Sequence, residues 1–299
     1  MRKDLDLHLS HEDNQCLQLL WRWKLLSTSA LHVAAYRERS VEGTYKRLLK
    51  LEKLKLIKTI SASTGDSYIW HLETLGFQLV LRTLPELAEV GYKSENKEHD
   101  FWVTAIHLGD WICQIPPCSD ICSEQQLRRL HREQYPEWVP RYIDHRPDGW
   151  WKIGIEKPSS ESLIALEVEF SRKSPMEYQT VGDFYSTIVM PYQVIWVVRQ
   201  ESDIEYIHRH IISGSKSNAH EQSYLLLEHY FHSQWQSKIV RGKNTGFSLS
   251  EILGTSSSQS RHQGASSVLL DTRKKPMNPV SHRKARTFEE GRSSSYLFY

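Results

Sequence analysis

Apolar residues at helical spacing, broken by short polar links, constrain the folding of residues 14–51 more than any other feature of the sequence. Behind Asp13, a candidate N-cap, they predict a first helix over 14–26. A short second helix is predicted over 27–36. Ser40 is a favourable N-cap for a third helix with apolar positions at Val41, Tyr45, Leu48, Leu49 and Leu51. We therefore expect three tightly linked helices before the first hairpin.

An extended segment follows these helices. The run IKTISASTGDSYIWHL, residues 57–72, contains two strand-like stretches around a turn signal at Thr64, Gly65 and Asp66. A further helix is predicted near 75–81, before the polar break GYKSENKEHD. Helix, turn, helix and hairpin in this order predict a winged helix-turn-helix domain over residues 1–92.

The third helix carries a basic face. Lys46, Arg47, Lys50 and Lys53 lie away from its apolar positions. In a winged helix, Thr44 and Arg47 would point into the major groove of double-stranded DNA. The three lysines, together with Lys55, would contact flanking phosphates. The alternative is a solvated basic face on a bundle helix.

The net charge of +2 conceals two basic zones. Residues 37–58 hold eight Lys or Arg against three acids, and residues 241–299 hold ten against four. The remainder of the chain is therefore acidic. This distribution is typical of a DNA-binding protein with a carboxylate-bearing body, and not of a general polyanion binder.

Composition also bears on the compartment. No stretch approaches the roughly 18 apolar residues of a membrane-spanning helix, and MRKDLDLHLS does not resemble a signal peptide. We therefore expect a cytoplasmic protein without a membrane partner, and four reduced thiols. A zinc site built from Cys113, Cys118 and Cys122 with His107 or His131 is disfavoured, because these cysteines form no CxxC pair.

Beyond the polar break, helical and strand-like patterns alternate. Strand, strand, helix, strand and helix in this order predict an α/β domain over residues 97–245, with helices packed on a sheet. From 246 to 299, Ser, Gly, Gln and basic residues predominate, and we expect a basic, mostly disordered tail.

Three carboxylates mark this second domain. Asp148 follows a proline in one predicted strand, and Glu167 and Glu169 share one face of the next, because strand side chains alternate. Carboxylate oxygens are the ligands that Mg²⁺ prefers, so these three are candidate ligands of Mg²⁺ or Mn²⁺. A metal held there can promote cleavage of a phosphodiester. The alternative is that the glutamates face solvent or pair with a neighbour such as Arg172.

The segments HRPDGWW and LEVEFSRKS together resemble the PD-(D/E)XK nuclease fold. Their position after a predicted winged helix is similar to that in the replication-relaxation family, which includes MobC-type plasmid mobilisation relaxases. The resemblance covers about residues 10–240. It implies a restriction-endonuclease-like mixed sheet flanked by helices, with metal bound by Asp148 and Glu167.

The sequence departs from that family pattern at one catalytic position. Glu169 stands where the motif has lysine, so a positive charge must come from elsewhere. Lys173 qualifies only if the chain bends near Ser171, since it lies roughly 13 Å beyond Glu169 on an ideal strand. Lys152 is the second candidate.

Other residues near the motif are weaker candidates. His145 and Arg146 precede the Pro-Asp pair and are placed to contact a phosphate of DNA. Tyr178 and Tyr185 share a helix face, and a tyrosine nucleophile is typical of relaxases, but a core role fits tyrosine more often.

These patterns lead to one functional expectation and two alternatives. We expect a DNA-binding protein of plasmid or mobile-element mobilisation or replication that nicks DNA in a metal-dependent reaction. The first alternative is a non-catalytic regulator or accessory protein with a decayed nuclease fold. The second is an adaptor that docks on a larger nucleoprotein complex, with the tail as the docking segment. The expected partners are double-stranded DNA and other mobilisation or replication proteins. Convergence of the three carboxylates on one point would favour the enzyme, and their separation would favour the regulator.

Overall fold

The computed structural model describes residues 9–61, 68–109, 119–141, 145–153, 162–188, 192–214 and 221–254. The N-terminal elements are α1 (His11–Trp23), β1 (Leu26–Ser27), α2 (Thr28–Ala35), α3 (Val41–Lys53), β2 (Ile57–Ser61), β3 (Tyr68–Leu72) and α4 (Thr74–Leu81). The later elements are α5 (Lys97–Leu108), β4 (Ser119–Ser123), α6 (Glu124–Arg129), η2 (Arg132–Gln134), β5 (Gly149–Ile153), β6 (Ser162–Glu169), α7 (Pro175–Ser186), β7 (Tyr192–Val198), α8 (Glu201–Gly214), β8 (Gln222–Leu226), α9 (Leu227–Ser233), η5 (Gln234–Gln236), β9 (Arg241–Gly242) and α10 (Leu249–Ile252).

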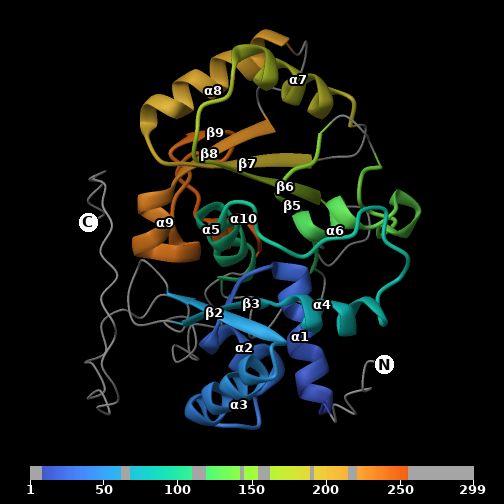
Figure 1. Ribbon diagram of the computed structural model, residues 1–299. Coiled ribbons are helices and arrows are strands. Elements are labelled where there is room, and N and C mark those ends of the chain that lie inside the picture. The colour runs from blue at the N-terminus through green and yellow to red at the C-terminus, as the bar shows by residue number, and fades with distance from the viewer. Residues whose placement is uncertain are drawn as a thin grey trace, which may run out of the picture.

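The N-terminal elements form a helical layer against a small sheet of order β1-β3-β2 (Figure 1). Serine N-caps set where the helices begin. The Ser27 and Ser40 side chains accept hydrogen bonds from the backbone at Ala30 and Gly43, which fixes the predicted starts of α2 and α3. The predicted turn at 64–66 lies outside the described residues.

The predicted bounds of the first helix, 14–26, were wrong at both ends. The Ser10 side chain accepts from the Asp13 amide at 3.2 Å and Asp13 accepts from the Ser10 amide at 2.8 Å, so the pair forms a capping box and α1 begins at His11. Lys24 has a positive φ of 60° and ends the helix after Trp23.

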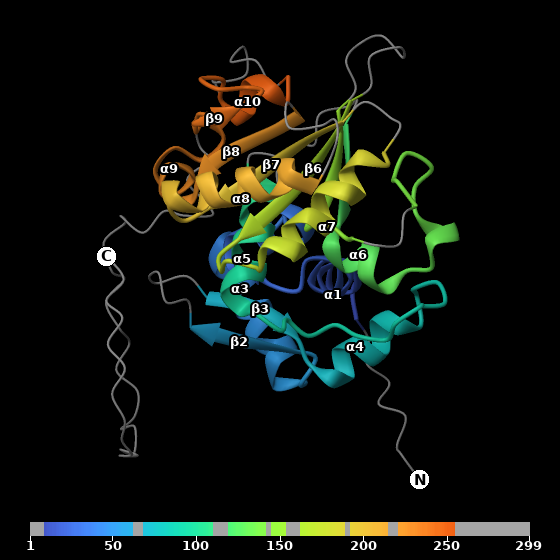
Figure 2. The same ribbon diagram turned by 90° about the horizontal axis from the view of Figure 1, so that it is seen from above.

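The described part of the larger sheet is mixed, with the order β4-β5-β6-β7-β8-β9. Strands β4, β5 and β6 pair antiparallel, β6, β7 and β8 pair parallel, and β9 is antiparallel to β8. Helices α7 and α8 lie on one face, as seen from above in Figure 2. The mixed α/β class predicted from the sequence is confirmed. Strands β4 and β8 were not predicted.

Burial follows strand alternation in β6. Leu166 and Val168 belong to the core on the α5 side, whereas Leu163 and Ala165 belong to the core under α7 and α8. Glu167 and Glu169 therefore face α7, on the same side as each other, as the alternation predicted.

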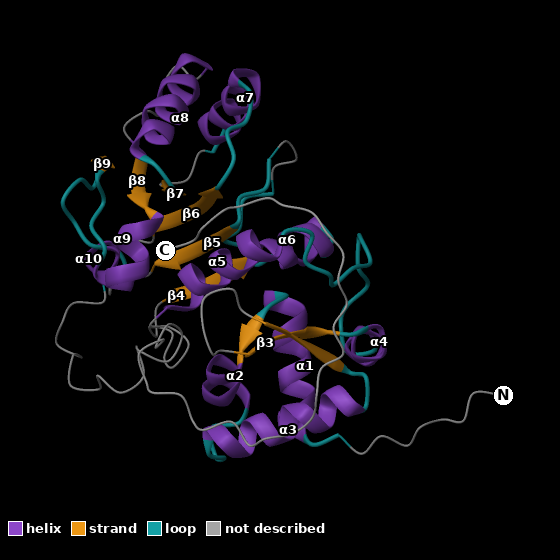
Figure 3. Ribbon diagram, turned by 60° about the vertical axis from the view of Figure 1, so that its left-hand side comes forward, coloured by secondary structure: helices purple, strands orange, loops and turns teal. Residues whose placement is uncertain are grey.

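The N-terminal elements and the larger sheet share one hydrophobic core. Trp21 and Trp23 of α1 belong to the same cluster of buried residues as Trp102 of α5 and Leu166 of β6. Figure 3 shows α5 between the two sheets, where it contributes to this shared core. The predicted boundary between residues 92 and 97 thus separates two parts that pack as one body.

Ordered structure continues past the predicted start of the tail at 246. Leu249 and Leu253, in and after α10, are 0% and 2% exposed, so the chain packs on the core as far as Gly254. The rest of the predicted tail, 255–299, lies outside the described residues. Among the helices that are described, none has the length and apolar character required to cross a bilayer.

Candidate functional site

The outward side of α3 is basic. Lys46, Lys50 and Lys53 are exposed, while Leu48 and Leu51 are fully buried beneath them. Lys46 also pairs with Glu42 at 2.7 Å, but both side chains are 68% exposed and such a surface pair is weak. These three lysines, called the α3 face below, are in the exposed positions predicted for phosphate contacts.

The predicted placement of Thr44 and Arg47 in a DNA groove was wrong. Thr44 is 0% exposed and its hydroxyl lies 3.2 Å from His32 Nδ1. Arg47 turns inward, where its Nε donates to Asp13 Oδ1 at 2.7 Å and a second nitrogen pairs with the other carboxylate oxygen. Because Asp13 is completely buried, Arg47 holds α3 against α1 instead of facing outward.

The three carboxylates lie where β5 begins and β6 ends. Gly149 pairs with Leu166 across the two strands, and the Asp148 amide donates to the Leu166 carbonyl at 2.9 Å. This register places Asp148 beside Glu167 and Glu169 at one sheet edge. We call these three residues the acidic site. Glu167 and Glu169 are only 4% and 6% exposed.

Glu167 is bound from two directions. His145 Nε2 and the Tyr185 hydroxyl each donate to its Oε1 at 2.5 Å. Burial lowers the pKa of His145, but the charge of Glu167 opposes this and the net shift is upward. His145 therefore pairs with a carboxylate, although it was predicted to contact a phosphate. Arg146 is exposed.

Tyr185 is a core residue. It is 0% exposed, and burial together with Glu167 raises the pKa of its hydroxyl well above the ordinary value. Tyr178 is also fully buried and accepts from the Lys173 amide at 3.2 Å. The core role that we favoured for these tyrosines is confirmed, because neither hydroxyl is presented to solvent.

Asp148 is held by a histidine that sequence reasoning missed. Its Oδ2 accepts from the Val168 amide at 2.7 Å and lies 3.4 Å from His99 Nε2, which also donates to the Val168 carbonyl at 3.0 Å. Burial lowers the pKa of His99, but Asp100 and Asp148 on its two sides raise it to about 10. The protonated imidazole of His99 thus lies between Asp100 Oδ1 and Asp148 Oδ2.

Lys173 reaches Glu169 because the chain bends. Strand β6 ends at Glu169, residues 170 and 171 form a bend, and Lys173 Nζ comes back to within 2.6 Å of Glu169 Oε2. Burial raises the pKa of Glu169, and Lys173 only partly counteracts this. The bend near Ser171, which Lys173 requires in order to reach the acidic site, is therefore present.

The other lysine candidate lies elsewhere. Lys152 pairs with Leu163 near the opposite end of β5, four positions from Asp148. Its backbone is therefore roughly 13 Å along the strand from the acidic site. The prediction that Lys152 could supply the positive charge of the absent motif lysine was wrong.

The fit of the acidic site to a divalent metal can be tested on these contacts. Its oxygen atoms have the right chemistry for Mg²⁺ or Mn²⁺. However, Asp148, Glu167 and Glu169 are directed to three different side chains, His99, His145 and Lys173. Among the described residues, no set of three or more His, Cys, Asp or Glu has an arrangement that would hold a metal ion. In this arrangement the predicted metal site does not fit, because each carboxylate contacts a different nitrogen-bearing side chain.

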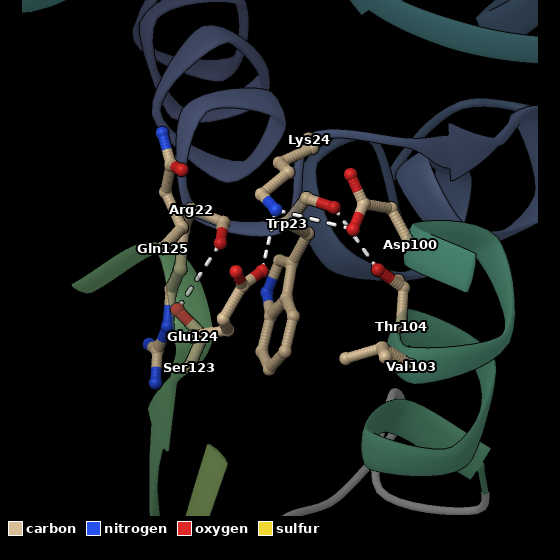
Figure 4. Close-up of a pocket in the computed structure, with 9 residues that line it drawn as sticks. All are labelled: Arg22, Trp23, Lys24, Asp100, Val103, Thr104, Ser123, Glu124 and Gln125. Atoms are coloured by element: carbon tan, nitrogen blue, oxygen red, sulfur yellow. Dashed lines mark hydrogen bonds and ion pairs between the residues drawn. The ribbon is translucent and has the colours of Figure 1, made fainter. Parts of the chain in front are cut away.

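A chain of polar contacts leads from the acidic site to α1. His99 Nδ1 lies 3.4 Å from Asp100 Oδ1, which is 3.1 Å from Lys24 Nζ. Lys24 also contacts Glu124 at 2.5 Å. Figure 4 shows this ammonium between the two carboxylates, in a pocket bounded by α1, α5 and the start of α6. The charged first turn of α5, KEHD, is a sequence signal for His99 and Asp100, but not for Lys24 or Glu124.

Comparison with known proteins adds no assignment, because no family model, no curated protein and no solved structure matches this chain.

Proposed function

We propose that this protein binds DNA through the α3 face and acts in mobilisation or replication as a non-catalytic regulator or accessory protein. The observation that carries the DNA-binding proposal is the exposed row of Lys46, Lys50 and Lys53, on the third helix of a helix-turn-helix followed by a hairpin. That order of elements is the one expected of a winged helix. The mobilisation or replication setting is supported only by the resemblance of HRPDGWW and LEVEFSRKS to the replication-relaxation family.

The state of the acidic site favours the regulator over the enzyme. A catalytic metal would need carboxylate oxygens directed to one point, whereas Asp148, Glu167 and Glu169 each contact a different basic side chain. The protonated His99 and Lys173 offset part of the negative charge without any added ion. We therefore derive no metal-dependent step at this site.

DNA binding is tested by the salt dependence of affinity. We expect Lys50→Ala to weaken binding to all duplex sequences about equally and to lower the slope of log K against log salt by about one unit. Lys238→Ala is the matched control, because Lys238 is also exposed but follows α9, a helix that Figure 1 shows apart from α3. Equal losses in both variants would show that binding reflects overall charge, and would contradict the proposal.

DNA cleavage is the second candidate, and the specific observation that favours it is Lys173. The bend after β6 brings an ammonium group beside Glu169, at the point where the PD-(D/E)XK resemblance lacks its lysine. A lysine there can orient an attacking water or stabilise developing charge on a phosphate.

Nicking of supercoiled plasmid, with EDTA, Mg²⁺ or Mn²⁺, separates the two candidates. The regulator predicts no nicks above a no-protein control in any condition. Nicks that disappear in both Glu167→Gln and Lys173→Met, while both variants keep wild-type DNA affinity, would overturn the regulator and establish the enzyme.

A further inference from the structure

The aromatic side chains beside the α3 face form an ordered cluster. Tyr45 of α3 and Tyr68 of β3 stack with ring centroids 5.0 Å apart and planes inclined by 26°. Trp70 lies behind both, at 6.2 Å from Tyr45 and 6.5 Å from Tyr68. Trp70 is fully buried and its Nε1 donates to Thr28 Oγ1 at 2.8 Å.

The outermost ring of this cluster is unusually accessible. Tyr68 is 46% exposed, although it stacks on a ring that itself rests on a buried tryptophan. A large ring fixed in this way loses little conformational entropy when a ligand covers it. Tyr68 is therefore a preorganised surface for a flat partner.

The chemistry around Tyr68 favours nucleic acid as that partner. Lys46 follows Tyr45 directly, about 100° further around the helix, and Lys50 and Lys53 continue the basic row. Ammonium groups beside an exposed aromatic ring are the combination that binds a phosphate backbone and stacks on its bases.

The α3 face itself offers little to read base edges. Thr44 is buried and Arg47 is paired with Asp13, so the exposed side chains of the helix are mainly lysines. Lysines bind phosphates without distinguishing sequence. Among the described residues beside the α3 face, the exposed ring of Tyr68 is the side chain suited to stack on a base. A base in an intact duplex has both faces covered by its neighbours.

Resting on the proposed DNA binding, we propose that Tyr68, supported by Tyr45, stacks on an unpaired base, so that the protein binds DNA containing a single-stranded segment. The lysines of the α3 face hold the flanking phosphates. Stacking uses the ring and not the hydroxyl group, which makes Tyr68→Phe a matched control for Tyr68→Ala.

The test compares two fluorescently labelled single strands of about 12 nucleotides, within the usual site size, one carrying thymine bases and one abasic throughout. Fluorescence anisotropy should show that the full-length wild-type protein prefers the base-bearing strand by about tenfold. Tyr68→Ala should abolish this preference and Tyr68→Phe should keep it. Tyr68→Ile, which retains strand propensity without an aromatic face, should behave like Tyr68→Ala and excludes a folding defect as the cause.

Three results would overturn the proposal. The first is that Tyr68→Ala keeps the preference for the base-bearing strand. The second is that Tyr68→Phe loses as much of this preference as Tyr68→Ala, which would assign the effect to the hydroxyl group. The third is that the wild-type protein binds duplex DNA but not the base-bearing strand. In the last case DNA binding by the α3 face stands while the stacking role fails. A wild-type protein that binds neither single strand nor duplex DNA would contradict both the proposed DNA binding and the stacking role.

Discussion

Replacing Arg47 with alanine should cost stability and not DNA recognition. Asp13 is 0% exposed, and the substitution removes its charged partner while Tyr36 still donates to it at 3.0 Å. Breaking a buried ion pair typically costs about 3–5 kcal/mol. Because the Arg47 side chain is 24% exposed and Asp13 keeps other donors, we expect the lower end, about 3 kcal/mol at pH 7.

The pH dependence of this loss has a defined sign. Burial alone would raise the pKa of Asp13, but hydrogen bonds from Arg47 and Ser10 hold it below the ordinary 3.8. A carboxyl group with a lowered pKa stabilises the fold above its unfolded-state pKa, and that contribution is lost as the pH falls through the folded value. The difference between wild type and Arg47→Ala should therefore shrink as the pH falls below 3.8.

Urea unfolding followed by tryptophan fluorescence measures this effect. Asp13→Asn combined with Arg47→Ala should cost less than the sum of the single variants, with a coupling of at least about 1 kcal/mol. Lys50→Ala is the matched comparison on the same helix, and should leave the free energy of unfolding within about 0.5 kcal/mol while weakening DNA binding. An Arg47→Ala protein of wild-type stability that has lost DNA affinity would refute the reasoning.

Two other buried groups give predictions of the same kind. Lys24→Met leaves the strained backbone at φ 60° unchanged but removes the ammonium between two carboxylates, so we expect a loss of about 3 kcal/mol in urea unfolding, reduced when Asp100→Asn is added. A loss within experimental error would show that the pair is not stabilising. His107 is completely buried, donating to the Asp148 carbonyl and accepting from Trp151, and burial lowers its pKa to about 4. Since the unfolded chain takes up this proton near pH 6.5, stability should fall by roughly 3 kcal/mol between pH 6.5 and 4, and His107→Gln should flatten that slope.

Local sequence signals predicted many of the helices and strands, but not the partners of their charged side chains. Ser40 marked the start of α3 because a serine cap acts over three residues, and the alternation in LEVE placed two glutamates on one face of β6. Arg47 was misplaced because its helical position, between the buried and exposed stripes, allows either direction. Its inward turn depends on Asp13, a buried carboxylate 34 residues earlier that needed a cation.

The contacts of the acidic site were likewise only partly predictable from the sequence. Spacing and the resemblance brought Asp148, Glu167 and Glu169 to one sheet edge, and the condition for Lys173 followed from strand geometry alone. His99 could not be predicted in this way, since it reaches Val168 across 69 residues through the packing of α5 on the sheet. Whether the carboxylates converge on one ion or pair with three separate side chains depends on such long-range neighbours, which leave no periodic trace in the sequence.

Helix α1 connects the two candidate sites as a rigid element. Its 13 residues span about 20 Å, with Asp13 bound to α3 near one end and Lys24 bound to Asp100 just beyond the other. Asp100 contacts His99, which holds Asp148, so the α3 face cannot shift relative to the acidic site without breaking a buried polar contact. Removing residues 1–90 would therefore do more than abolish DNA binding. It would uncover Val103 and Thr104 on the side of α5 that meets Trp23, and would remove Lys24 from Asp100. We expect the remaining sheet to lose its fixed packing, seen as a loss of near-ultraviolet circular dichroism. A truncated protein that keeps this signal and melts cooperatively would show that the sheet folds without α1, and that the link is a contact between independent domains.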